Sequence, residues 1–527
     1  MEQEKIEKKH KKIMIYVMII SLICVVGVSY AFFTAGMSSE TSTTVRADAG
    51  TMKITYSGGA NINLAGIYPK DDVWATKTIT VTGNNTTDAE MYYKLTLVVD
   101  SNTFKTDDPL QYELVSTNTS TNGEIIPNIS KTDITGTSIE LGSGHFVKAN
   151  NAKHTYLLKI YYPKKTTSQN ANQGAAFSAH VEITSAKAPK TNGKLSELVL
   201  YNNEVKTPIT APGKEVSTAS EALLASTPDD YGTSYYFRGA VKNNYVEFAN
   251  KCWRIVRVGG DGSVKLILHN DNTAKAANPC NSANNSTTAA FARYSGTTYK
   301  SAFNTNADDN AYVGFMYGTP GSSTYADTHA NTNKSTILTN LETWYNNNLK
   351  TYESVIDDNV WCNDKTNVTD TTYKPLWADV NGLGLGYGKN VTYYGATKRL
   401  VSTSDSAGGT GPSLKCNGEL SKINSKVGLI TADELAFAEY AYNIRNTVTY
   451  LKENTSGEWW SLSPSDYISI YANVWTVESY GTYFTTGLGG RGGRGVHDSC
   501  GVRPLISLKS TTNVTGNGSS DKPYKVV

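Results

Sequence analysis

Short runs of alternating apolar and polar residues constrain this chain more than any other feature of its sequence. In the run MYYKLTLVVD, the side chains of Tyr93, Leu95 and Leu97 fall on one face of an extended strand, and lysine and threonine fall on the other. Similar runs, among them TKTITVTG and TYLLKIYY, are separated by polar turn clusters such as GNNTTD. A strand with one apolar face is half buried in a sheet. We therefore predict that residues 35–188 form an antiparallel β-sandwich.

The length and composition narrow the class of protein. A chain of 527 residues is too long for one ordinary hydrophobic core, and length alone indicates roughly three domains. Charged residues make up 18% of the chain and the formal net charge is +2, so the charge balance does not favour nucleic-acid binding. Threonine, asparagine, serine, glycine and tyrosine are abundant, which is typical of β-rich extracellular proteins. We expect an exported protein with no nucleic acid among its partners.

The cysteines bear on cross-links and metals. The last five of the six cysteines have no CxxC spacing, so we predict no metal cluster and up to two disulfides with one thiol left over. Loop length favours a Cys362–Cys416 disulfide first. The next pair on the same grounds is Cys252 with Cys280, which leaves Cys500 unpaired. Because a sequence does not determine connectivity, other pairings stay open.

The N-terminal segment, residues 1–34, sets the compartment. A lysine-rich start precedes an unbroken apolar run over residues 13–28. The small residues Ser29 and Ala31 match a signal-peptidase site, which predicts cleavage directly after the alanine. Extended to residues 13–33, the run approaches the roughly 20 residues that span a bilayer, so a retained membrane anchor is the alternative. Under either interpretation the body of the chain is secreted or displayed at the cell surface.

The first domain resembles a known family in the order of its segments: VGVSYAFFTA, then AGTMKITYSGGANINLAGIYPKDD, then a strand ending in VTGNN. This order is similar to the camelysin and biofilm-matrix fibre-protein family over residues 13–188. The resemblance implies a jelly-roll-like sandwich, export through a dedicated signal peptidase and fibre assembly at a Gram-positive surface. Some family members are described as metalloproteases. The chain has no HExxH motif, and His145, His154 and His180 lack helical ligand spacing, so we predict three surface histidines on strands.

Two further segments complete the chain. Residues 189–232 are punctuated by prolines, and we predict a semi-ordered linker there. Residues 233–527 contain, near their start, CWRIVRV, the glycine turn GGDG and VKLIL, which together predict a hairpin. Two helices should follow, one in STILTNLETWYNNNL and one in LITADELAFAEYAYN, where Thr431 and Glu434 make a capping box. Asp433 and Glu434 resemble a catalytic pair, but their place at a helix start indicates dipole stabilisation instead.

The series WRIVR, GDGSVKLI, GLITADE, WWSLSPS and GVRPLISL resembles the C-type-lectin fold of the formylglycine-generating-enzyme type on bacterial surface proteins. The resemblance covers residues 233–509 and implies a mixed α+β domain whose penultimate strands present a ligand face. It also implies that some residues are core: Trp459, Trp460, Val502, Pro504 and Leu505. The oxidising enzymes of this fold need a copper-binding cysteine pair, and no cysteine lies close to Cys500 in the sequence. We therefore predict no enzyme activity and no cofactor.

Residues 458–508 are the segment that we expect to meet a ligand. Its apolar ends can fix it into a core, and its middle is rich in tyrosine and arginine, which binding surfaces favour. The predicted ligand-binding residues are Tyr467, Tyr471, Asn473, Glu478, Tyr480, Tyr483, Arg491, Arg494, His497 and Asp498. The loop GLGGRGGRG is interpreted either as a flexible surface loop or as a contact loop whose arginines reach a carboxylate.

The same segment has a biased composition. Residues 465–500 contain no lysine, glutamine or methionine. A diversity-generating retroelement, which mutates adenines, would produce this bias, and an ordinary lysine-poor binding loop explains it equally well. The sequence thus predicts an adhesin-like surface protein whose lectin-fold module recognises a glycan or protein ligand. The alternative is a structural matrix or fibre subunit of the cell envelope.

Overall fold

The computed structural model describes residues 44–48, 51–86, 90–118, 122–186, 189–375, 384–446, 448–468, 470–477, 484–485 and 494–527. The chain divides into two compact units, residues 1–188 and residues 189–527, which we call unit 1 and unit 2. The predicted signal segment, residues 1–34, lies outside the described residues. None of the helices in the described part of the chain has the length and hydropathy that a membrane span needs.

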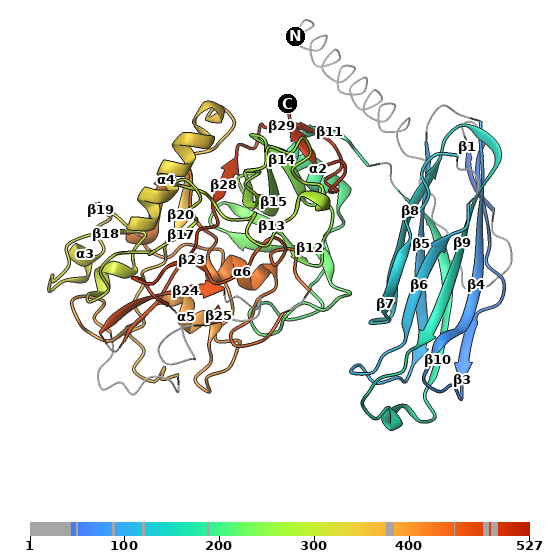
Figure 1. The fold of residues 1–527 in the computed structure, drawn as a ribbon, viewed down its shortest axis with the longest axis horizontal. Helices are drawn as coiled ribbons and strands as arrows, with labels where there is room; N and C mark the ends of the chain where they lie inside the picture. The colour runs from blue at the N-terminus through green and yellow to red at the C-terminus, as the bar shows by residue number, and fades with distance from the viewer. Residues whose placement is uncertain are drawn as a thin grey trace, which may run out of the picture. The chain divides into compact units, whose positions relative to one another are not determined.

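Unit 1 is built from two antiparallel sheets (Figure 1). As described, the larger sheet has six strands in the order β1 (Thr44–Asp48), β2 (Thr51–Ser57), β4 (Lys70–Asn85), β9 (Ala149–Tyr162), β6 (Gln111–Ser116) and β7 (Ile129–Asp133). The smaller sheet has four in the order β3 (Ile62–Ala65), β10 (Ala176–Ser185), β5 (Met91–Asn102) and β8 (Ser138–Phe146). Buried side chains of both sheets form one hydrophobic cluster, so unit 1 is a β-sandwich, as predicted.

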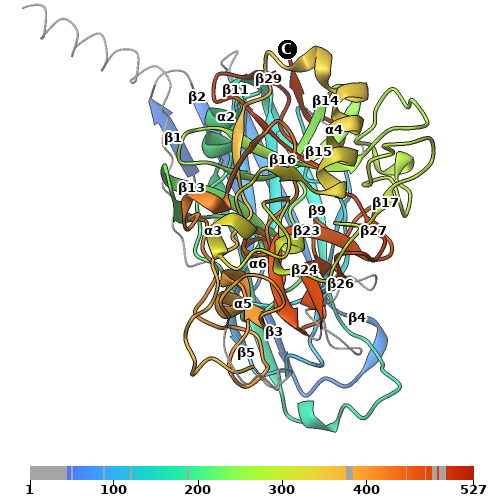
Figure 2. The same cartoon turned by 90° about the vertical axis from the view of Figure 1, so that its left-hand side faces the viewer.

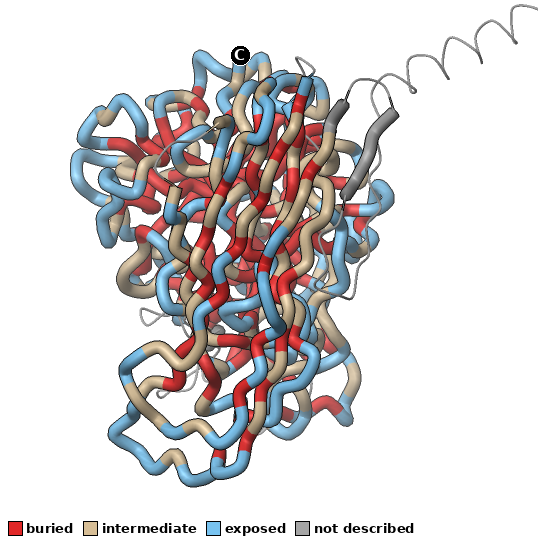
Figure 3. Tube along the Cα trace, turned by 90° about the vertical axis from the view of Figure 1, so that its right-hand side faces the viewer, coloured by how far each residue is buried: buried red, intermediate tan, exposed pale blue. Residues whose placement is uncertain are grey.

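Alternation along the long strands makes the core of unit 1. On β5, Met91, Tyr93, Leu95 and Leu97 are buried, and the residues between them are half-buried. This is the period of two that an extended strand imposes on its side chains. Figure 3 shows the same alternation of buried and less buried positions along the neighbouring strands. Each strand therefore gives one face to the core and the other to solvent.

One predicted surface histidine is buried. His154 has no exposed area, and its ring stacks on Phe146 with the ring centres 4.1 Å apart. Its Nδ1 lies 2.6 Å from the hydroxyl of Tyr93, and its Nε2 lies 2.8 Å from the carbonyl oxygen of Asn122. Burial lowers the pKa of His154. The prediction of a surface position was wrong because alternation places this part of β9 toward the core.

The larger sheet of unit 2 joins strands from both ends of this unit's sequence. In the described residues its main path runs β11 (Asn192–Lys194), β29 (Asn513–Thr515), β30 (Tyr524–Val526), β14 (Tyr245–Phe248), β15 (Lys251–Val258), β13 (Gly232–Gly239) and β12 (Ala222–Asp229). Strand β16 (Val264–Asn270) pairs with β15 and with β28 (Leu505–Leu508). The predicted hairpin is confirmed, since β15 and β16 pair antiparallel on either side of residues 259–262.

Residues 189–232 are not a linker but part of unit 2. Strand β11 pairs with β29, and β12 pairs with β13. Between them, helix α2 (Leu195–Asn202) contributes Leu195, Leu198 and Val199 to the core of unit 2. The prediction was wrong because the segment has few apolar residues of its own. It becomes ordered by pairing with strands hundreds of residues away.

A second sheet of unit 2 contains the predicted ligand segment (Figure 2). Its described strands follow the order β17 (Lys300–Ser301), β27 (Cys500–Gly501), β23 (Trp459–Ile468), β24 (Tyr471–Val477) and β25 (Phe484–Thr485). Strand β21 (Thr392–Tyr393) pairs with β23, and β26 (Arg494–Gly495) pairs with β24. Two short sheets, β18 (Met316–Tyr317) with β19 (Asn333–Lys334) and β20 (Asn359–Cys362) with β22 (Lys422–Ser425), lie outside it.

The predicted helices are confirmed. Helix α4 (Thr336–Asn348) buries the apolar residues that recur at helical spacing, namely Ile337, Leu338, Leu341, Trp344 and Tyr345. Helix α6 (Ala432–Ala438) begins at Thr431 with the predicted capping box to Glu434. Two shorter helices, α3 (Tyr325–Thr328) and α5 (Gly395–Leu400), also belong to unit 2.

Both predicted disulfides are present. Cys252 is bonded to Cys280, and Cys362 is bonded to Cys416. Cys500 is free and buried. Disulfides persist in oxidising compartments and are rare in reducing ones, so the two bonds indicate an extracellular or otherwise oxidising environment.

Candidate functional site

Four side chains of the predicted ligand segment meet on one surface, which we call the β24–β26 face. Strand β26 pairs antiparallel with β24 and places Arg494 opposite Val474. The turn after β26 then brings His497 beside Tyr471 and carries Asp498 next to it. The face consists of Tyr471, Arg494, His497 and Asp498. The structure thus joins residues that are more than twenty positions apart in the chain.

An aromatic pair occupies the middle of this face. The rings of Tyr471 and His497 lie with their centres 5.1 Å apart and their planes tilted by 30°. His497 is exposed and Tyr471 is half-buried, so ring surface remains open to solvent. The histidine ring packs closely over Gly495, where a Cβ atom would come within 2.8 Å of Cε1. The glycine is therefore needed for the ring to take this position.

Charged groups flank the aromatic pair. Arg494 donates from Nη2 to Oε1 of Glu458 over 2.7 Å, and from Nε to the other carboxylate oxygen. Its Nη1 also lies 3.8 Å from Oδ2 of Asp498. The hydrogen bonds that Arg494 donates to Glu458 raise the pKa of the guanidinium, which stays charged. The arginine side chain is still 45% exposed, so part of this fork-shaped cation remains open to solvent.

The apolar ends of the predicted ligand segment are buried. Trp459, Trp460, Val502, Pro504 and Leu505 lie in the interior of unit 2, as the resemblance implied. Trp460 donates from Nε1 to the carbonyl oxygen of Ser301 over 2.7 Å, which holds the indole in place. The β24–β26 face therefore belongs to a segment whose two ends are fixed in the core.

Two predicted ligand residues do not reach the face. Tyr467 is 1% exposed and donates from its hydroxyl to the carbonyl oxygen of Asp308 over 3.1 Å. Asn473 is also 1% exposed and donates from Nδ2 to Oδ1 of Asp466 over 2.7 Å. Both side chains are therefore interior groups and cannot contact a ligand. The reason is that every position of β23, and every position of β24 after Tyr471, is buried, so alternation leaves neither face of these strands to solvent.

The remaining predicted residues lie outside the described part of the chain: Glu478, Tyr480, Tyr483 and Arg491. One residue of the site was missed. Glu458 holds Arg494 in place from the position directly before the buried tryptophans. The sequence signal was an isolated acidic residue, Glu458, directly before the two tryptophans. This signal indicates an ion pair, but it does not show that Arg494 is the partner, because only the fold brings the two together.

Cys500 lies beneath the same face. Its Sγ is 3.7 Å from Oε2 of Glu458. Burial, together with that carboxylate, raises the pKa of the thiol well above its ordinary value. The sulfur is therefore protonated at neutral pH and is a poor nucleophile and metal ligand. In the described residues, no group of three histidine, cysteine, aspartate or glutamate side chains could hold a metal ion.

A second set of charged residues is enclosed in unit 2, and we call it the charge cluster. Arg257 donates from Nε to Oε1 of Glu434 over 2.9 Å, and the Nζ of Lys265 lies 3.0 Å from the same oxygen. Arg399 holds Asp433 through two hydrogen bonds of 2.7 and 2.8 Å. The cavity between these groups has a volume of about 40 Å³, too small for more than a water molecule or two.

The charge cluster has no acid or base free for catalysis. Burial alone would raise the pKa of Glu434, but Lys265 and Arg257 outweigh it and lower the pKa to about 2. The carboxylate is thus permanently ionised and paired. The predicted dipole role of this helix start is incomplete, since the two first-turn acids, Asp433 and Glu434, also anchor three cations from other elements.

Comparison with known proteins does not assign a family. A scan against protein-family models and a search of the curated proteins each found no match. The fold and the site define a disulfide-bonded, β-rich protein with an aromatic and charged face on its second unit. Its function is therefore argued from this geometry.

Proposed function

We propose that this protein is a secreted or cell-surface binding protein, adhesin-like in role, that recognises a glycan or protein ligand through the β24–β26 face. The observation that carries the proposal is the pair of Tyr471 and His497 rings, followed directly by Asp498, whose carboxylate lies 3.8 Å from the exposed Arg494 guanidinium. Tyrosine and arginine are enriched among the residues that dominate the energetics of binding surfaces.

The chemistry of the face fits a ligand with both apolar and polar edges. Aromatic rings pack against the apolar face of a sugar or against an aliphatic side chain. Arg494 can donate to a carboxylate or hydroxyl of the ligand, although Glu458 already accepts two of its hydrogen bonds. Asp498 supplies acceptors on the other side of the arginine. A sugar acid or an acidic protein loop therefore matches the face best.

Three further features support this proposal. The order of motifs in residues 233–509 resembles that of a C-type-lectin-like domain, and this resemblance implies that the penultimate strands present the ligand face. The two disulfides agree with export. The lysine-free composition of residues 465–500 agrees with a segment that a retroelement diversifies, which is expected of a recognition surface.

The alternative proposal is a matrix or fibre subunit with a jelly-roll-like unit 1. It draws on the strands at the ends of the two sheets, β1 and β7 in one and β3 and β8 in the other. Unpaired sheet edges can accept a strand from another chain. Long filaments of purified protein in negative-stain electron microscopy, together with no ligand in array screens, would favour this alternative.

The binding proposal is tested by screening the full chain on glycan and protein arrays. The double variant Tyr471→Ala, His497→Ala should weaken binding of any hit at least roughly tenfold, a loss of about 1.4 kcal/mol. The variant Tyr231→Ala removes another exposed tyrosine, 58% exposed, and should bind as the wild type does. Equal affinities of the wild type and the double variant would contradict the proposal.

A further inference from the structure

A separate pocket of unit 2 lies at the start of helix α5, and we call it the α5 pocket. Three stretches form its walls: residues 366–370, the helix itself, and residues 410–417. Its volume is about 370 Å³, which is at the small end of the roughly 300–1,000 Å³ that small-molecule sites occupy. None of its lining residues belongs to the β24–β26 face. Any ligand of the α5 pocket is thus independent of the function proposed above.

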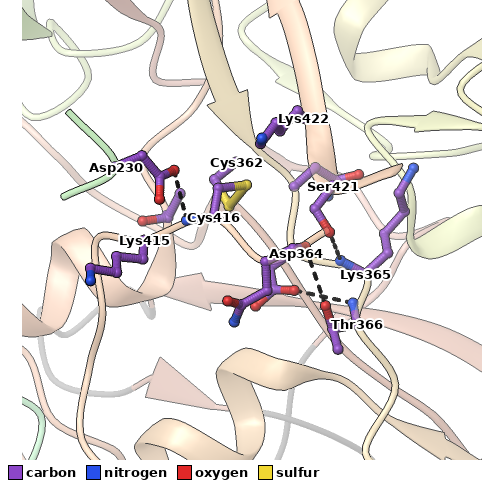
Figure 4. Close-up of a disulfide and its surroundings, with 12 residues drawn as sticks. Asp230, Cys362, Asp364, Lys365, Thr366, Lys415, Cys416, Ser421 and Lys422 are labelled. Atoms are coloured by element: carbon purple, nitrogen blue, oxygen red, sulfur yellow. Dashed lines mark hydrogen bonds between the residues drawn. A yellow bond between two sulfur atoms is a disulfide. The ribbon is translucent and has the colours of Figure 1, made fainter. Parts of the chain in front are cut away.

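The walls of the α5 pocket are fixed to one another. The Cys362–Cys416 disulfide ties the first wall to the third, and Figure 4 shows it beside Thr366. Lys398 on the helix lies 2.8 Å from a carboxylate oxygen of Asp370 on the first wall, which joins these two. The third wall is attached to the helix where the backbone N–H of Thr410 donates to the carbonyl oxygen of Lys398 over 3.1 Å. Such a pre-formed pocket binds without an ordering cost.

The polar side chains of the pocket differ in whether they already form hydrogen bonds or ion pairs within the protein. Thr369, Thr410 and Asn417 are exposed, and within the described residues their side chains take part in no hydrogen bond. Arg399, by contrast, is occupied by Asp364 and by Asp433 of the charge cluster. The pocket thus offers two hydroxyls and one amide that have both donors and acceptors to give.

The lining also excludes other ligand classes. The cation of Lys398 and the anion of Asp370 neutralise each other, so the wall has no net charge that would favour an ionic ligand. Among the lining residues, Val368 is the single aliphatic side chain, and it is buried. The apolar surface of the pocket therefore comes mainly from carbon atoms of its polar residues and backbone, so aliphatic side chains contribute little to it. Closely spaced hydroxyl, amide and ion-pair groups instead match a molecule that carries many hydroxyls.

We propose that the α5 pocket binds one or two rings of an uncharged saccharide. Thr369, Thr410 and Asn417 form hydrogen bonds to its hydroxyls, and the ends of the Asp370–Lys398 pair that face the pocket add an acceptor and a donor. Because a site of paired donors and acceptors loses much affinity when one partner is missing, the pocket should distinguish sugars that differ at a single hydroxyl.

The proposal is tested by saturation-transfer NMR of the full chain with free glucose, galactose, mannose, N-acetylglucosamine and N-acetylgalactosamine. We expect transfer to at least one of these sugars. Asn417→Ala should raise the dissociation constant roughly tenfold, the equivalent of about 1.4 kcal/mol. Thr369→Trp, which fills the pocket, should abolish the signal. Thr403→Trp places the same ring at an exposed threonine outside the lining and should leave the signal unchanged.

The outcomes separate the two sites. The double variant Tyr471→Ala, His497→Ala should bind the free sugar as the wild type does. Loss of the sugar signal in that variant would assign the sugar to the β24–β26 face and overturn the pocket proposal. Absence of transfer from every sugar in the panel, or equal binding by the tryptophan variants at positions 369 and 403, would overturn it as well. Thermal melting of each variant confirms that it is folded.

Discussion

The interiors of the two units differ in what they bury. In the described part of unit 1, the buried polar residues are Lys77, Asn85, His154 and Asn172. Unit 2 buries three arginines completely, Arg238, Arg254 and Arg503. Arg238 meets Glu221 at 2.9 Å, and neither side chain of this pair has any exposed area. One unit is therefore held by apolar alternation, and the other also depends on charges in its interior.

The difference follows from how the strands are covered. A strand of the unit 1 sandwich faces the core on one side and solvent on the other, so most of its polar residues stay on the outer face. Strands β16 and β23 of unit 2 are buried at every position. A charge on such a strand cannot reach water and must find an opposite charge. Unit 2 should therefore be the more sensitive of the two to loss of a single charge.

The largest effect is expected from removing one cation of the charge cluster. Arg399→Ala leaves the buried carboxylates of Asp364 and Asp433 without their partner. A broken buried pair costs roughly 3–5 kcal/mol of the free energy of unfolding. Denaturant unfolding followed by tryptophan fluorescence measures it, because every tryptophan except Trp74 belongs to unit 2.

A surface pair in the same unit is the matched control for this variant. Lys334 and Glu342 pair while 50% and 34% exposed, so Lys334→Ala should cost about 1 kcal/mol or less. If Arg399→Ala lowered the free energy of unfolding no more than this control does, the charge cluster would not stabilise unit 2. The two interiors would then not differ in how much buried charges contribute to stability.

The next largest effect is expected from the disulfides. Both lie in unit 2, the unit with the buried ion pairs. Replacing Cys362 and Cys416 together by serine should cost roughly 2–4 kcal/mol in unit 2. Residues 35–188 contain no cysteine, so a thiol reductant should leave the unfolding of unit 1 unchanged. Circular dichroism during denaturation in the presence and absence of dithiothreitol measures both. A shift of the unit 1 unfolding transition by dithiothreitol would contradict the expectation that the disulfides stabilise unit 2 alone.

The two disulfides should also differ from each other. Cys252 and Cys280 are buried, whereas Cys362 and Cys416 are half-buried. Mass spectrometry after limited reduction with dithiothreitol under native conditions, with alkylation of the released thiols, should therefore find Cys362 and Cys416 labelled first. Earlier labelling of Cys252 would show that access in solution does not follow burial.

A smaller, pH-dependent effect is expected at Asp466. Burial raises the pKa of this carboxyl to about 6, although Ser465 and Asn473 donate to it. Because the folded-state pKa lies above the unfolded value, ionisation opposes folding: the penalty is absent below about pH 4, grows as the pH rises to about 6 and is complete above that. Relative to Asp466→Asn, the wild type should lose on the order of 2 kcal/mol between pH 4 and pH 7. A pH-independent difference between the two proteins would contradict this.

The smallest effects belong to unit 1 and have opposite signs. Burial lowers the pKa of His154. For His180, burial would lower the pKa, but hydrogen bonds to Asp100 and Glu182 outweigh it and raise the pKa. NMR titration of the histidine Cε1 protons should therefore find one midpoint below 6.5 and the other above it. Protonation of His154 opposes folding because its folded-state pKa is lowered. Asp100 raises the pKa of His180 and is no cause of the shift at His154. Asp100→Ala should therefore remove only the upward shift of His180 and leave His154 unchanged.

Local sequence signals predicted much of the fold. The hairpin of β15 and β16, the apolar spacing of α4 and the capping box at Thr431 each depend on residues a few positions apart, and all three are confirmed. The strands of unit 1 were predictable for the same reason, since a period of two is visible within a single strand. Loop length was enough to choose both disulfides among the possible pairs.

The candidate site was predictable only in part. Of the predicted residues that the structure describes, Tyr471, Arg494, His497 and Asp498 meet at one face, and Tyr467 and Asn473 are interior. The sequence shows which residue types favour binding, but not which strands are covered on both sides. For the same reason the sequence did not show that residues 189–232 are ordered. Their strand β11 pairs with β29, which lies at the other end of the chain.

By itself, the sequence determined the β-rich character, the helix starts, the buried tryptophans and the cysteines available for cross-links, because these depend on side-chain type and short spacing. Only the tertiary structure decided which charges are buried together, which tyrosine and histidine rings pack on each other and which polar side chains line the α5 pocket. These arrangements join residues far apart in the chain. Their partners are set by how the sheets are covered, and no local pattern records that.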